Sequence, residues 1–79
     1  MAKQIVHLIF PQNLIKEPAI YTMAKKYDII PNVRRAKITE EIGEVTLELD
    51  GTKENLEKGR KYLEKIGIKV EPVVGDIVE

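Results

Sequence analysis

The sequence predicts one α+β domain whose elements follow the order strand, helix, strand, strand, helix, strand. Apolar residues recur at helical spacing in two separate segments, and runs with the length and apolar content of strands flank each of them. Residues 44–50 alternate cleanly between apolar and polar, which is typical of a strand with one face on a core and the other in water. The chain of 79 residues has room for a single domain.

The first half of the chain predicts a strand, a loop and a helix. The strand covers Ile5–Phe10 and ends where Pro11 cannot donate to a sheet ladder. A loop follows, and Pro18 suits the first turn of a helix, where a missing N–H costs nothing. This helix should stop before Pro31, because proline disfavours helical geometry in the residue before it. Its apolar stripe is Ile20, Met23, Ala24 and Tyr27.

The middle of the chain predicts a hairpin of two strands. A polar strand over residues 32–41 turns at Ile42-Gly43 and returns along residues 44–50. In the returning strand, Val45, Leu47 and Leu49 should face the core.

The last third predicts a capped helix and an edge strand. Thr52 is placed to cap the helix. Gly59 costs about 1 kcal/mol in mid-helix relative to alanine, so we expect it to pack closely on the sheet. Gly67 should end the helix, and Pro72 suits an edge strand that begins at Ile68. The domain is expected to cover residues 3–74, with a flexible tail at 75–79.

These elements predict the topology of the ferredoxin-like sandwich. Two right-handed β-α-β units joined by a hairpin form a four-stranded antiparallel sheet of order 4-1-3-2, with both helices on one face. The other face stays open, and alternate residues of the two central strands should lie on it. Exposed isoleucines in the middle of a sheet indicate an interface. The predicted interface residues are Ile5, His7, Ile9, Thr46 and Glu48.

Composition excludes several classes of protein. Thirteen basic and thirteen acidic residues cancel, so the chain lacks the positive field of most sequence-independent nucleic-acid binders. The absence of cysteine excludes disulfides and thiolate metal sites. No apolar run approaches the roughly 20 residues of a membrane span or forms a signal sequence. We therefore expect a cytoplasmic protein without a cofactor or a metal. A core of this size typically gives a net free energy of unfolding of only about 3–5 kcal/mol, which favours association with a partner.

Several segments also carry a resemblance to a known family. They follow one another in a fixed order: Phe10-Pro11, Pro18–Ile20, Lys26–Asp28, Asn32–Ala36, Gly43–Gly51 and Leu63–Val70. In this order and spacing the chain resembles the NIL domain, best known as the C-terminal regulatory domain of methionine ABC-importer ATPases. The resemblance implies an ACT-like fold, a homodimer and binding of methionine. The Asn-Ile-Leu triplet of the family corresponds here to Asn32, Val33 and Arg34.

Two groups of residues are candidate ligand contacts. Asn32, Val33 and Arg34 begin the second strand, where the amide of Asn32 either contacts a ligand or closes an Asx turn. Gln12 and Asn13 belong to the loop before the first helix, whose N–H groups suit an anion.

Two further features have a structural and a functional interpretation. His7, the one histidine, is expected on the surface or in an interface, near Glu48. Arg34, Arg35 and Lys37 form a basic strip on a predicted edge strand. Such a strip commonly prevents unwanted pairing, and the alternative is a partner that carries carboxylate or phosphate.

No nucleophile–base pair, phosphate loop or metal-ligand spacing is present, so we do not expect an enzyme. Two hypotheses remain. The first is a homodimeric sensor of methionine or a related amino acid. The second is an adaptor that docks on a partner protein of sulfur or methionine metabolism through its open sheet face.

Overall fold

The computed structural model of the chain describes residues 2–73. The predicted tail at residues 75–79, and residue 74 at the predicted end of the domain, lie outside the described residues. The elements are β1 (Ala2–Phe10), the short 3-10 helix η1 (Gln12–Leu14), α1 (Ala19–Tyr27), β2 (Ile30–Ile38), β3 (Gly43–Gly51), α2 (Lys53–Lys65) and β4 (Lys69–Pro72). Apart from η1, this is the predicted order of strands and helices.

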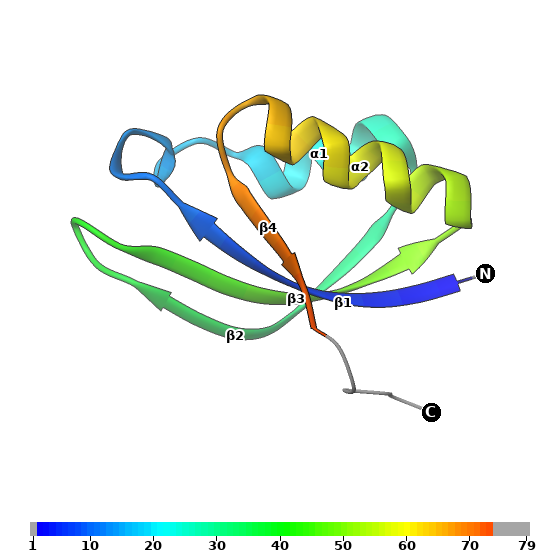
Figure 1. Ribbon diagram of the computed structural model, residues 1–79, viewed down its shortest axis with the longest axis horizontal. Helices are drawn as coiled ribbons and strands as arrows, with labels where there is room; N and C mark the ends of the chain where they lie inside the picture. Colours follow the sequence, from blue (N-terminus) through cyan, green and yellow to red (C-terminus); the bar gives the residue numbers. More distant parts are fainter. Residues whose placement is uncertain (1, 74–79) are drawn as a thin grey trace.

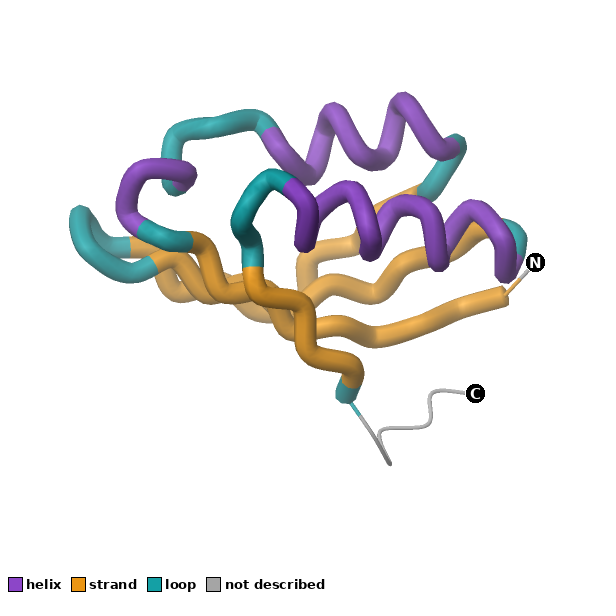
Figure 2. Tube along the Cα trace, turned by 45° about the horizontal axis from the view of Figure 1, so that its top comes forward, coloured by secondary structure: helices purple, strands orange, loops and turns teal. Residues whose placement is uncertain are grey.

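The four strands form one antiparallel sheet of order β2-β3-β1-β4, which is the predicted order read from the other edge. Both helices cover one face of this sheet, and no helix of the described residues 2–73 covers the other (Figures 1 and 2). The predicted ferredoxin-like sandwich is therefore confirmed. The central strands β1 and β3 pair along their whole length, from Ala2 opposite Gly51 to Phe10 opposite Gly43.

The core lies between the sheet and the helices. Strand alternation places Val6 and Leu8 of β1 and Leu47 and Leu49 of β3 in it, all without exposed surface, as the pattern of β3 predicts. Met23 and Leu63 enter from the two helices and are also fully buried. Because these side chains come from both layers, the fold is held together mainly by apolar burial.

A threonine hydroxyl stabilises both the hairpin turn and the start of the second helix. The turn lies at residues 39–42, before the predicted Ile42-Gly43, because Gly43 already belongs to β3. The hydroxyl of Thr39 accepts the N–H groups of Glu41 and Ile42 at 3.2 and 3.0 Å, which closes the β2–β3 turn. The hydroxyl of Thr52 accepts the N–H of Asn55 at 3.1 Å and caps α2 as predicted. Strand β2 starts at Ile30, two residues before the predicted start, because extended geometry before a proline is compatible with pairing at a sheet edge.

Gly59 packs closely, but not on the sheet. A Cβ atom at this position would lie 2.5 Å from Cδ1 of Ile29 and 3.1 Å from Sδ of Met23. The glycine thus lets α2 approach α1 and the residue that leads into β2. The predicted close approach is correct, and the predicted partner is wrong.

The open face differs from its prediction at Ile5. Alternation with Val6 and Leu8 does place Ile5, His7 and Ile9 on the face away from the helices. However, Ile5 is only 7% exposed and Ile9 is half-buried, so neither is the freely exposed isoleucine that we expected. Ile5 lies opposite the long side chain of Glu48, and its carbonyl accepts the N–H of Val73 at 3.0 Å. Neighbouring strands therefore shield it without any contribution from the helices.

Candidate functional site

An apolar groove opens between the start of α1 and the far end of the hairpin. Its volume is about 210 Å³, smaller than the roughly 300–1,000 Å³ of sites for drug-sized ligands. A single amino acid is a ligand of suitable size. The apolar walls are formed by Phe10, Ile15, Pro18, Ile20, Tyr21 and Ile38.

Polar groups lie at one end of this groove, where α1 begins. Glu17 and Ala19 line it, and the Ala19 N–H is already bonded to the Glu17 carbonyl at 2.8 Å. The next N–H groups of a helix have no intrahelical acceptor, and they lie at the positive end of the helix dipole. The Glu17 carboxylate adds one negative charge. The groove therefore combines an apolar wall with donors for a carboxylate and an acceptor for an ammonium group.

The predicted ligand residues do not form one site. Gln12 and Asn13 are exposed in η1 and line a second cavity with Ile15, Lys16 and Glu40, beside the apolar groove. Ile15 lines both cavities, so Gln12 and Asn13 lie at the same end of the sheet as the groove.

Asn32, Val33 and Arg34 lie toward the opposite end of the sheet. Asn32 is opposite Glu48, which in turn is opposite Ile5, whereas the groove is at Phe10. Five residues of β1 separate the two places, a distance of roughly 16 Å along a strand. Arg34 donates from Nη1 to Oε1 of Glu48 at 3.2 Å, so its charge is already paired.

Sequence reasoning missed Tyr21 and Ile38 as groove residues. Tyr21 is an aromatic residue outside the predicted apolar stripe of its helix, and Ile38 is an apolar residue in a polar strand. Both departures from the expected pattern were visible in the sequence, and each marks a side chain that the core does not bury. Tyr21 is 63% exposed and Ile38 is 61% exposed.

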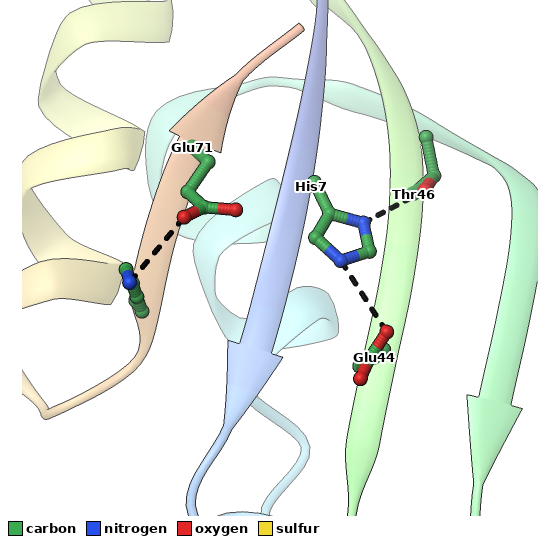
Figure 3. Close-up of polar contacts among 5 residues, drawn as sticks. His7, Glu44, Thr46 and Glu71 are labelled. Carbon is green, nitrogen blue, oxygen red and sulfur yellow. Dashed lines mark hydrogen bonds and ion pairs between the residues drawn. The ribbon is translucent and has the colours of Figure 1, made fainter.

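The open face carries a polar cluster around His7 (Figure 3). Nδ1 of His7 lies 3.0 Å from the hydroxyl of Thr46, and Nε2 lies 3.6 Å from a carboxylate oxygen of Glu44. On the other side of β1, Glu71 forms an ion pair with Lys69 at 3.4 Å. The predicted neighbour of His7, Glu48, is wrong. The register places His7 opposite Thr46, one pair further along the same face.

A bulge in β2 shapes the basic strip. The register shifts between Val33 and Arg35, so two consecutive arginines lie on the open face. Arg34 donates to Glu48, and Arg35 is opposite Thr46. Arg35 and Lys37 line a cavity of about 280 Å³ with the His7 cluster. The predicted location of the strip on an edge strand is confirmed.

Exposed apolar residues gather along the hairpin edge instead of the sheet centre. Ile30, Val33 and Ile38 of β2 are 61%, 57% and 61% exposed, and Ile42 in the turn is 43% exposed. Of these residues, Ile38 lines the apolar groove.

Among residues 2–73 there is neither a helix that could span a membrane nor a cluster of side chains that could hold a metal ion. Neither α1 nor α2 combines the length and the apolar character that crossing a bilayer requires. Within residues 2–73, no three His, Asp or Glu side chains are grouped so that they could hold a metal ion.

Comparison with known proteins identifies a family and a structural neighbour. The model of the NIL domain matches residues 4–72. The crystal structure of the C-terminal domain of an ABC transporter ATP-binding protein from Enterococcus faecalis superposes with a TM-score of 0.81. It is 21% identical in sequence, and the match covers 92% of this chain and 86% of that one. At this identity the likeness concerns the fold. No curated protein matches the chain.

Proposed function

Because the chain belongs to the NIL-domain family, we propose that it is a regulatory module, not an enzyme, that binds methionine or a related amino acid as a cytoplasmic homodimer. The apolar groove at the start of α1 is the observation that carries this proposal. It accepts an unbranched apolar side chain against Phe10, Ile20 and Ile38. The N–H groups of the first turn of α1 face the α-carboxylate, and Glu17 faces the α-ammonium group.

Calorimetry against a panel of amino acids tests the ligand. Methionine should give saturable heat, whereas lysine and aspartate should give none, because the groove walls offer their charged ends no partner. Silence across the panel contradicts amino-acid sensing.

Ile38→Glu tests the location of the ligand. The substitution places a carboxylate in the groove wall and should weaken methionine binding at least tenfold, since a charge desolvated beside an apolar side chain costs more than about 1.4 kcal/mol. Ile30→Glu is the matched control. Ile30 is equally exposed on the same strand, but it lies opposite Asp50, outside the groove. Equal losses in both variants would place the ligand elsewhere.

The open sheet face supports the homodimer. Its central strand β3 carries Glu44 and Glu48, and its edge strand β2 carries Arg35 and Lys37. A two-fold axis can therefore place the basic strip of each copy on the acidic row of the other, which is the self-complementarity that an isologous interface requires.

Ile9→Glu tests this interface by light scattering. Ile9 lies on the open face between β3 and β4, opposite Glu44 and Lys69. The variant removes the apolar surface of Ile9 and places a charge that the interface would have to desolvate, so the mass should shift from dimer toward monomer. An unchanged dimer mass would remove the sheet face from the proposal.

The uncovered face with its His7 cavity also favours the second candidate function. In that case the domain is an adaptor that docks on a partner protein of sulfur or methionine metabolism. The adaptor hypothesis differs from the sensor hypothesis in one expected result: an adaptor gives no heat of binding with any amino acid.

A further inference from the structure

Strand β2 is an unusual sheet edge. It is nine residues long, it pairs with no strand but β3 among residues 2–73, and every residue except Pro31 is exposed. The opposite edge, β4, has four residues and ends in Pro72, which is a common way to blunt an edge. Strand β2 has its proline, Pro31, near its start, and from Asn32 to Ile38 its protection is limited to the bulge and its charges. It therefore presents backbone N–H and C=O groups to any extended chain that approaches.

The two faces of this edge differ in chemistry. On the helix side, Val33 and Ile38 are more than half exposed, and Ile38 lines the groove together with the exposed Tyr21. On the open side, Arg35 and Lys37 carry positive charge and form no ion pair within the described residues. A strand added here meets an apolar strip on one face and a basic strip on the other.

A second copy of the chain fits this edge poorly. Two β2 strands paired antiparallel about a two-fold axis at Arg35, Ala36 or Lys37 would place a cation directly opposite a cation, which destabilises a strand pair. The charges instead complement an acidic chain.

We propose that β2 accepts an acidic, extended segment of a partner protein as a fifth strand. Side chains alternate along a strand, so the segment has apolar residues toward Val33 and Ile38 and acidic residues toward Arg35 and Lys37. Main-chain hydrogen bonds supply affinity, and the two strips supply orientation and selectivity. The docked strand would use the backbone edge of β2 and the same Arg35 and Lys37 that the proposed homodimer uses, so the two interactions would compete. Its apolar side adjoins the ligand groove at Ile38.

A fluorescent seven-residue peptide of alternating glutamate and valine is the probe, and anisotropy is the readout. The full-length protein should bind it saturably, whereas the lysine–valine peptide should bind at least tenfold more weakly. N-methylation of alternate amides gives two further peptides. Only the one methylated on the amides that face β2 should lose binding.

The double variant Arg35→Gln/Lys37→Gln should weaken binding of the acidic peptide roughly tenfold, the effect of two exposed ion pairs. Lys58→Gln/Lys61→Gln on α2 is the matched control with the same loss of charge, and it should bind like the wild type. Methionine calorimetry should be unchanged in both, which separates this proposal from the ligand proposal.

Three results would overturn the inference. They are equal binding of the acidic and basic peptides, equal loss with both methylated peptides, or no binding at millimolar concentration.

Discussion

Leu47→Ala should lower the free energy of unfolding by about 2–5 kcal/mol, the range measured for removing a fully buried leucine. Leu47 lies on the central strand β3 between Val6 of β1 and Val33 of β2, and it has no exposed surface. Shortening it removes apolar contacts and leaves a cavity beneath both helices. Since small domains net only a few kcal/mol, the variant should lose most of its stability in urea denaturation.

Thr46→Ala is the control on the adjacent residue. Thr46 faces the opposite side of the sheet, where its hydroxyl lies 3.0 Å from Nδ1 of His7. Its loss should cost about 1 kcal/mol, the net value of one hydrogen bond. Similar losses for the two variants would contradict the assignment of the two faces of β3.

Gly59→Leu should lower the free energy of unfolding by about 3 kcal/mol, at the upper end of typical overpacking effects. Even the first carbon of a side chain would lie 2.5 Å from Ile29, and the sulfur of Met23 is 3.1 Å away. The gain in helix propensity, about 1 kcal/mol, is too small to offset the displacement of α2 from α1. Urea denaturation measures the change.

Two comparisons isolate the cause. Lys58→Leu places leucine on the exposed side of the same helix and should change stability by less than about 0.5 kcal/mol. Ile29→Val removes the Cδ1 atom that a new Cβ would meet, so Gly59→Ala should be tolerated better in the presence of Ile29→Val than alone. Additive effects in this double-mutant cycle would show that Ile29 is not the limiting contact.

The apolar groove and the β2 edge share Ile38, and this has a consequence for regulation. A ligand in the groove would contact one side of the Ile38 side chain, and a strand docked on β2 would contact the other side. Binding at one place would then change affinity at the other by the same factor. Anisotropy with the acidic peptide, repeated with saturating methionine, measures this coupling directly.

Local patterns in the sequence determined the elements and their order. The alternation of residues 44–50, the cap at Thr52 and the glycine at Gly67 act within a few residues of themselves, so they can be recognised without tertiary information. The same patterns determine which side of β1 and β3 faces the helices. The handedness of β-α-β crossovers then leaves one strand order, and the family resemblance agrees with it.

Tertiary structure alone decided the candidate sites. The alignment of β1 with β3 places His7 opposite Thr46 and not opposite Glu48. The alignment of β2 with β3 creates the bulge that puts Arg34 and Arg35 on the same face. The burial of Ile5 depends on neighbours distant in the chain. The groove requires the start of α1 and the end of β2 to meet. Register and packing arise from many weak contacts between distant residues, and no short segment of the sequence carries them.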